Sequence, residues 1–225
     1  MIGMLDIEVS FDLVCPWCLI GKRNLERALI SVRNSYPEVT IRIVWRGVQL
    51  LPDVPAKGLL FTEFYEQRLG SRAAVQIRQE QVKEAALLVG LNINLERITL
   101  MPNTDKAHRF LKYAAKHGSS EQYESLLERL FSAYFILGED IGNEETLLNI
   151  AQSYGFNRTE LKSWLAAPEA SLAESLRPLV HAGVPYFVFN RRHAIAGAHP
   201  PGTLVSVMLN LIAEELVHDT SIPAG

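Results

Sequence analysis

A Cys-Pro-Trp-Cys motif at residues 15–18 is the feature that most restricts how this chain can fold. Its thiols, Cys15 and Cys18, are the only cysteines among 225 residues. An apolar run over residues 5–14 precedes the motif, and residues 18–33 have the spacing of an amphipathic helix. The motif therefore lies where a predicted strand gives way to a predicted helix. Two thiols one helical turn apart at such a junction are suited to exchanging a dithiol for a disulfide.

The two cysteines are expected to act in different ways. Unpaired N–H groups at the start of a helix stabilise negative charge, and this effect favours a thiolate at Cys15, which we predict to be the nucleophile. Cys18, one turn further along, is expected to be more buried and to resolve the mixed disulfide. Pro16 fits a first helical position, which needs no N–H donor. Trp17 is expected to lie exposed beside the pair and to shape the surface that a substrate meets.

A zinc site and a pair of inert cysteines are the alternatives to a redox function. Structural zinc commonly takes four ligands, from two such cysteine pairs or from one pair and nearby histidines. This chain has no second cysteine pair. Its six histidines are scattered, and the closest candidates for a ligand pair, His193 and His199, lie far from the motif along the chain. These features favour redox chemistry without a metal.

Composition and charge argue against two classes of partner. Hydrophobic residues make up 48% of the chain and charged residues 21%, as in an ordinary soluble globular protein. The net charge is −3 and no basic cluster is present, so neither nucleic acid nor an anionic membrane is an expected partner. The first six residues do not resemble a signal peptide, and no stretch approaches a membrane span. We therefore expect a cytoplasmic protein, in which such a cysteine pair is catalytic or redox-sensing rather than a structural crosslink.

The order of predicted elements indicates a sheet interrupted by helices. Residues 5–11 and 40–45 have strand patterns, and the helix between them predicts a right-handed crossover with parallel strands. From residue 61 to about residue 182 the pattern is almost wholly helical. A β-hairpin over residues 186–196 and a helix after residue 202 follow. Because the two halves of the sheet must pair to bury their apolar faces, the helical segment is predicted to be an insertion.

A proline directly before the hairpin allows two interpretations. Gly183-Val184-Pro185 precedes the strand pattern, and proline suits the start of a strand because it cannot donate a ladder hydrogen bond. Alternatively, the Val184–Pro185 peptide bond is cis and faces the cysteine pair, which would leave neighbouring backbone groups free to bind an extended substrate peptide. Position alone does not separate these interpretations.

Segments along nearly the whole chain resemble one protein family. The residues from Val14 to Lys22 resemble the active-site segment of the DsbA superfamily, specifically its FrnE-like branch. Further segments that resemble this branch occur in order along the chain: Trp45-Arg46, Gln49-Leu50, Asn103-Thr104, Ala107-His108-Arg109, Leu130-Phe131, Ala133-Tyr134-Phe135, Asp140-Ile141-Gly142, Gly183-Val184-Pro185-Tyr186-Phe187-Val188 and Gly197-Ala198. The cysteine motif alone is moderately specific for this family, whereas the whole set of segments in this order is strongly specific for it.

The resemblance implies an α/β protein with a thioredoxin-like fold and an inserted all-helical domain. The thioredoxin-like domain would comprise residues 1–60 and 183–225. The helical insertion would comprise residues 61–182, and its last helix, at about 168–182, could pack on the thioredoxin-like sheet. The resemblance also implies that Pro185 follows a cis peptide bond.

The implied activity is thiol–disulfide exchange with Cys15 and Cys18 as catalytic residues. The expected substrates are protein or small-molecule disulfides and thiols. No metal or organic cofactor is expected, although glutathione could serve as a co-substrate. Because the chain has no other cysteine, an external thiol must reduce the pair. The residues predicted to bind substrate are Pro16, Trp17, Val184, Pro185 and His108.

The sequence leaves the roles of three polar residues open. Glu8 and Asp12 lie just before the motif, and His108 lies in one of the segments that resemble the family. Thioredoxin itself carries a buried aspartate six residues before its first cysteine, and that position is Val9 here. Side chains alternate between the two faces of a strand, so Glu8 and Asp12 are expected to point outward, away from the face that Val9 occupies. His108 lies in a predicted helix among apolar residues. It would be either a surface or interface histidine, or a residue that contacts substrate or tunes the thiols.

Two other functions fit parts of this pattern. Kappa-type glutathione transferases and 2-hydroxychromene-2-carboxylate isomerases resemble the architecture and use glutathione, but they usually carry serine in place of the attacking cysteine. Both cysteines are present here, which favours redox chemistry. A protein-binding or holdase module is the non-enzymatic alternative, and it predicts an activity that survives Cys15→Ser.

Overall fold

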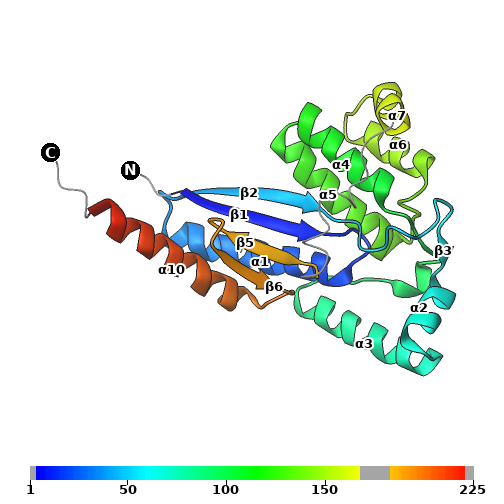
Figure 1. Ribbon diagram of the computed structural model, residues 1–225, viewed down its shortest axis with the longest axis horizontal. Coiled ribbons are helices and arrows are strands. Elements are labelled where there is room, and N and C mark those ends of the chain that lie inside the picture. The colour runs from blue at the N-terminus through cyan, green and yellow to red at the C-terminus, as the bar shows by residue number, and fades with distance from the viewer. Residues whose placement is uncertain (1–3, 168–182, 221–225) are drawn as a thin grey trace.

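A mixed sheet joins the two ends of the chain. In the computed structural model, which describes residues 4–167 and 183–220, with side chains as far as residue 215, its strands are ordered β2-β1-β5-β6. The strands are β1 (Met4–Phe11), β2 (Thr40–Gly47), β5 (Tyr186–Phe189) and β6 (His193–Ala196). β1 pairs with β2 in parallel and with β5 in antiparallel orientation (Figure 1). The parallel pairing of the first two strands is confirmed, and so is the pairing across the helical segment.

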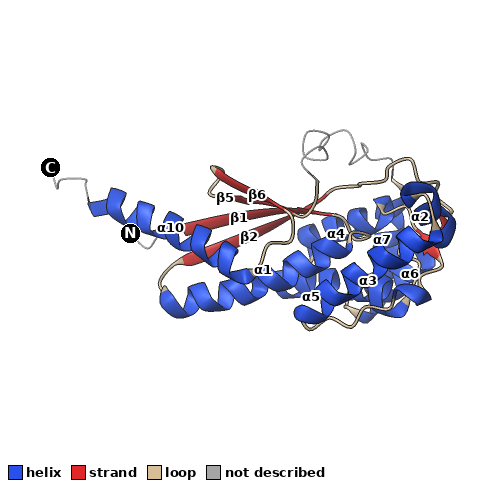
Figure 2. Cartoon of the chain, turned by 90° about the horizontal axis from the view of Figure 1, so that it is seen from below, coloured by secondary structure: helices blue, strands red, loops and turns tan. Residues whose placement is uncertain are grey.

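Two helices pack on one face of this sheet. α1 (Pro16–Ser35) and α10 (Pro201–Thr220) contact each other and lie on the same side of the strands (Figure 2). Alternate side chains of β1 and apolar positions of both helices form one buried cluster, which includes Leu5, Ile7, Val9, Leu25, Leu29, Val32, Leu204, Met208 and Leu211. Removing apolar surface from water, at roughly 25 cal/mol per Å², stabilises this packing.

A block of helices lies beyond one end of the sheet (Figure 2). Its helices, in chain order, are α2 (Phe61–Leu69), α3 (Arg72–Leu88), α4 (Asp105–His117), α5 (Ser120–Ser132), a π-helical turn (Ala133–Leu137), α6 (Glu144–Ser153) and α7 (Arg158–Ala166). Polar side chains fix several helix starts. Ser119 and Gln122 form a capping box at α5, Asn143 caps α6, and Asn157 caps α7.

A short strand pair interrupts the helical block. β3 (Leu59–Leu60) pairs antiparallel with β4 (Leu100–Met101), which follows a 3₁₀ turn at Leu95–Arg97. The prediction of an almost wholly helical segment was wrong at β4, because two residues are too few for an alternating pattern to show. The helix predicted at about residues 168–182 lies outside the described residues. The proposed domain boundaries, at residues 60 and 182, stay predictions.

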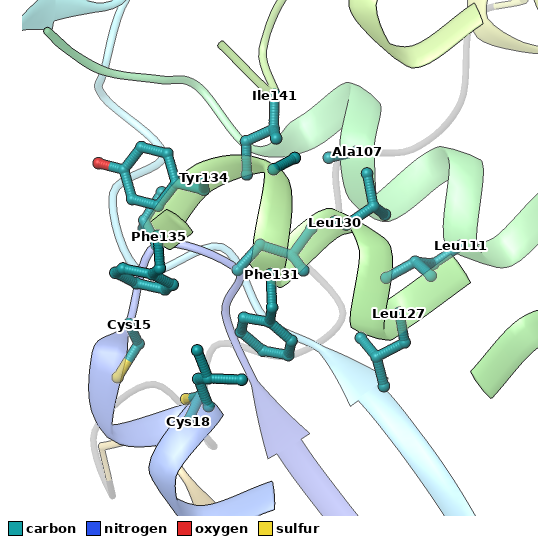
Figure 3. Close-up of a cluster of buried hydrophobic side chains, with 14 of the residues drawn as sticks. Cys15, Cys18, Ala107, Leu111, Leu127, Leu130, Phe131, Tyr134, Phe135 and Ile141 are labelled. Carbon is teal, nitrogen blue, oxygen red and sulfur yellow. The ribbon is translucent and has the colours of Figure 1, made fainter. Parts of the chain in front are cut away.

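The cysteine motif lies where the sheet meets the helical block. A second buried apolar cluster includes Phe11 at the end of β1 and both cysteines at the start of α1, and it continues into α4, α5 and the π-helical turn. Figure 3 shows Cys15 and Cys18 beside Phe131 and Phe135. The sheet and the helical block therefore position the cysteines together. None of the described helices combines the length and the apolar character that crossing a membrane requires.

Candidate active site

The backbone beyond β1 fixes the position of both cysteines. β1 ends at Phe11, and Cys15 is the N-cap residue of α1, with an extended backbone conformation (φ −92°, ψ 110°). The N–H of Cys15 donates to the carbonyl oxygen of Asp12 over 3.2 Å, and the N–H of Cys18 donates to the carbonyl oxygen of Cys15 over 3.0 Å. Pro16 begins the helix, where its missing N–H is not needed.

The two thiols differ in exposure, and burial changes the acidity of Cys18. Cys15 keeps 8% of its surface exposed and Cys18 keeps 2%. Burial raises the pKa of the Cys18 thiol well above its ordinary value; Cys15 and the charge of Asp12 raise it further, and a backbone hydrogen bond with Asp12 acts in the opposite direction. Cys18 therefore stays a thiol at neutral pH. The expected greater burial of Cys18 is confirmed.

The Val184–Pro185 segment lies directly against Cys15. The Val184–Pro185 peptide bond is cis. The Cys15 thiol points at the carbonyl oxygen of Val184, with 3.6 Å between sulfur and oxygen, although 169 positions separate the two residues in sequence. Gly21 of α1 makes this approach possible, because a Cβ atom there would lie 2.9 Å from the Cγ of Pro185. The fold thus brings two separately predicted segments into one site.

Asp12 lies behind the motif and is wholly buried, with 0% of its surface exposed. One carboxylate oxygen accepts a hydrogen bond from the N–H of Leu50 over 2.8 Å, and the other lies 3.0 Å from Nε2 of His108. The prediction of an outward-facing Asp12 was wrong. β1 ends one residue earlier, so the alternation of the strand does not extend to Asp12. A buried acid therefore does lie close enough to act on Cys18.

His108 lies in the interface between the sheet and the helical block, with 2% of its surface exposed. Its ring packs edge-on against Phe11, and its Nδ1 atom has no hydrogen-bond partner among the described residues. Gly47 of β2 allows this packing, since a Cβ atom there would lie 2.3 Å from Nδ1. Substrate binding by His108 stays a prediction.

Across residues 4–167 and 183–220, no three His, Cys, Asp or Glu side chains lie close enough together to hold a metal ion.

A cavity of about 320 Å³ opens beside the motif. Pro16 and Trp17 form one wall, and Trp17 is half-buried rather than exposed as predicted. Tyr65 of α2 and Phe135 of the π-helical turn contribute to the opposite wall. Burial and the nearby charge of Cys15 raise the pKa of Tyr65 to about 12. Sequence reasoning missed Tyr65, because its position on α2 carries no signal that relates it to a motif some fifty residues earlier.

Comparison with known proteins gives one family match along most of the chain. A family model described as a DSBA-like thioredoxin domain matches residues 6–208. The uncharacterised protein YwbO of Bacillus subtilis (strain 168) is 24% identical over 159 residues, which are 71% of this chain and 70% of that protein.

Solved structures share the fold. A probable DsbA oxidoreductase from Streptomyces coelicolor has a TM-score of 0.80 at 23% identity, covering 98% of this chain and 93% of that one. A 2-hydroxychromene-2-carboxylate isomerase has a TM-score of 0.63 at 16% identity, covering 96% and 100% of the two chains. The cytosolic disulfide reductase DsbM from Pseudomonas aeruginosa, solved with GSH, has a TM-score of 0.56 at 16% identity, covering 92% and 99%. These matches confirm the predicted thioredoxin-like fold. Because the family model spans most of its length, the chain belongs to the family of DSBA-like thioredoxin domains.

Proposed function

We propose that this chain is a thiol–disulfide oxidoreductase that acts on protein disulfides through Cys15 and Cys18. One observation carries the proposal: the Cys15 thiol at the N-cap of α1 keeps 8% of its surface exposed and lies 3.6 Å from the carbonyl oxygen of Val184, one turn from the more deeply buried Cys18. Membership of the DSBA-like family supports it. From the resemblance of the motif segments, we also propose that the chain belongs to the FrnE-like branch.

The exchange takes two displacement steps. In the first, the Cys15 thiolate attacks one sulfur of the substrate disulfide, the S–S bond breaks, and the other substrate sulfur leaves as a thiolate that takes up a proton. In the second, Cys18 releases its proton and attacks the Cys15 sulfur. The Cys15–Cys18 disulfide then forms, and the second substrate thiolate leaves and is protonated. The substrate gains two electrons and two protons, and the cysteine pair loses two electrons. One proton comes from Cys18, and the solvent returns the proton that Cys15 released when its thiolate formed.

The segment beside Cys15 is suited to hold an extended substrate. A substrate sulfur bonded to Cys15 would bring its own chain alongside Val184 and Pro185, where main-chain hydrogen bonds are available whatever the substrate sequence. Pro16 and Trp17 would contact the substrate from the other side of Cys15. We therefore keep these four residues as the proposed substrate-binding set.

The cysteine pair must exchange electrons with an external thiol, because the chain has no further cysteine. Glutathione is the co-substrate that we propose for this step. We also propose a cytoplasmic location, which would keep the pair reduced and favour reduction or isomerisation of substrate disulfides over oxidation.

The test is insulin-disulfide reduction by the purified protein with an external thiol. We expect Cys15→Ser to abolish the activity, because the remaining thiol, Cys18, is only 2% exposed and stays protonated at neutral pH. Cys18→Ser is expected to accumulate mixed disulfides at Cys15, visible by mass spectrometry after acid quenching, because nothing resolves them. Denaturation curves of both variants serve as controls for folding.

Full activity in Cys15→Ser would overturn the proposal. Suppression of protein aggregation that survives Cys15→Ser, with no disulfide reduction by the unmodified chain, would indicate a holdase instead. Conjugation of glutathione or isomerisation that survives Cys15→Ser would indicate the transferase or isomerase alternative.

A further inference from the structure

The cavity beside the motif has an apolar wall built by the helical block. Trp17 lines it from the side of the motif, and Phe61, Tyr65, Val75 and Phe135 line it from α2, α3 and the π-helical turn. Its volume is about 320 Å³, which is sufficient for one large apolar side chain. Such a lining favours an apolar occupant, because removing apolar surface from water is favourable.

The cavity lies within reach of a substrate bonded to Cys15. The residues on both sides of Cys15, Val14 and Pro16, line it. Figure 3 shows the ring of Phe135 next to Cys15, and the charge of Cys15 acts on Tyr65. A residue of extended peptide advances about 3.3 Å, so the residue adjacent to a substrate cysteine can place its side chain here.

Two arginines stand at the mouth of the cavity. Arg68 of α2 and Arg78 of α3 line it, and both side chains are exposed. Within residues 4–167 and 183–220, neither forms an ion pair with a carboxylate, whereas Arg72 on the same helix as Arg78 pairs with Glu66. The cavity therefore combines an apolar interior with a positively charged mouth, and a charge-complementary occupant carries a carboxylate beside an apolar group.

We propose that this cavity selects disulfide-bonded peptides in which an apolar residue next to the cysteine enters the cavity and an acidic residue faces Arg68 and Arg78. The inference rests on the proposed exchange at Cys15 and adds the sequence class of its substrates. Glutathione has carboxylates but no apolar side chain, so it would meet the arginines and leave the apolar wall uncovered. The cavity is thus better matched to protein substrates than to glutathione.

The test compares the rates at which the reduced protein reduces four disulfides. Three are blocked homodimeric peptides with the sequences Asp-Leu-Cys, Lys-Leu-Cys and Asp-Ser-Cys, and the fourth is oxidised glutathione. Each rate constant is divided by that for dithiothreitol with the same disulfide, which removes differences in intrinsic reactivity. We expect Asp-Leu-Cys to react fastest, at least about fivefold faster than Lys-Leu-Cys. The reason is that Arg68 and Arg78, whose charges solvent partly screens, attract the aspartate and repel the lysine.

Variants separate the cavity from the general charge of the molecule. The double variant Arg68→Glu/Arg78→Glu is expected to reverse the preference between Asp-Leu-Cys and Lys-Leu-Cys while leaving the rate with Asp-Ser-Cys slower than in the unmodified chain. Arg72→Glu is the matched control, an exposed charge reversal on α3 that does not line the cavity, and it is expected to keep the original preference.

Equal rates for the acidic and basic peptides would overturn the inference, and so would an equal effect of Arg72→Glu. Faster reduction of oxidised glutathione than of Asp-Leu-Cys would indicate that the arginines bind glutathione rather than a peptide. This result would also overturn the inference. In each of these cases the proposed exchange at Cys15 stands. If neither these disulfides nor insulin is reduced, the proposed function fails, and this inference fails with it.

Discussion

A single helical turn separates the environments of the two cysteines. Cys15 stands at the N-cap, at the edge of a cavity and beside Val184, whereas Cys18 points into the cluster that joins the sheet to the helical block. Burial then makes Cys18 a poor acid, while Cys15 keeps more of its surface exposed, 8% against 2%. The proposed division of labour between nucleophile and resolving cysteine follows from these positions.

The raised pKa of Cys18 predicts a loss of stability at alkaline pH. In the unfolded chain its thiol titrates near about 8.5, and in the folded reduced protein it titrates higher. Below the unfolded value both states hold the proton. As pH rises above it, the unfolded chain loses its proton first, so the free energy of unfolding falls, by at most about 1.4 kcal/mol per pH unit for one proton.

Urea denaturation of the reduced protein between about pH 7.5 and pH 9.5 measures this effect. We expect the midpoint to fall more steeply in the unmodified chain than in Cys18→Ala, which keeps Cys15 and all tyrosines. Parallel slopes in the two proteins would show that the burial of Cys18 does not influence its titration.

Asp12 shows the limit of sequence reasoning at the residue scale. The alternation expected for the strand was continued to Asp12, one residue past the end of β1. It therefore predicted an outward-facing side chain for a carboxylate that is wholly buried. Its partners, Leu50 and His108, lie 38 and 96 positions away in the sequence. Local periodicity carries no information about such partners. His108 was singled out only because it lies in a segment that resembles the family.

The contact of α1 with the segment at Pro185 is the critical one at the scale of elements. Gly21 lies on the face of α1 that meets Pro185 and Phe187. No side chain fits between them, because even a Cβ atom would come within 2.9 Å of Pro185 and 3.3 Å of Phe187. The glycine thus sets how closely the helix that carries Cys15 approaches the segment that carries Val184.

Gly21→Ala is therefore expected to destabilise the protein. Overpacking costs about 1–3 kcal/mol, and the better helix propensity of alanine returns up to about 1 kcal/mol. We expect a net loss of about 1 kcal/mol in urea denaturation and slower disulfide exchange, because Val184 moves relative to Cys15. Gly202→Ala is the matched control, since nothing lies within 4 Å of a Cβ atom there. A Gly21→Ala protein as stable and as active as Gly202→Ala would refute the role given to this contact.

Strong periodic patterns predicted most elements, and weak ones failed. In β1, α1 and the hairpin of β5 and β6, apolar and polar residues recur over enough positions for the strand or helix to be recognised from the sequence. The two-residue strands β3 and β4 do not, and β4 was missed. That the two halves of the sheet pair could be inferred only from the need to bury their apolar faces, and the structure confirms this pairing. The antiparallel orientation of β1 and β5 was not predicted.

At the scale of the whole molecule, the helical block supplies half of the site. The sequence pointed to Cys15, Cys18 and Pro185, because their motifs are local. It did not point to Tyr65, Arg68 or Arg78, which come to line one cavity with the start of α1 only in the folded chain. Tertiary packing brings these side chains together, and a single sequence carries no sign of it.

Redox titration of the full chain tests the central claim most directly. The protein is equilibrated in glutathione buffers from fully reduced to fully oxidised, quenched with acid, and analysed by mass spectrometry. We predict one reversible two-electron transition between the dithiol and a Cys15–Cys18 disulfide, which Cys15→Ser abolishes. A chain that remains a dithiol in every buffer, or that accumulates glutathione on Cys15 without closing the bond to Cys18, would contradict it.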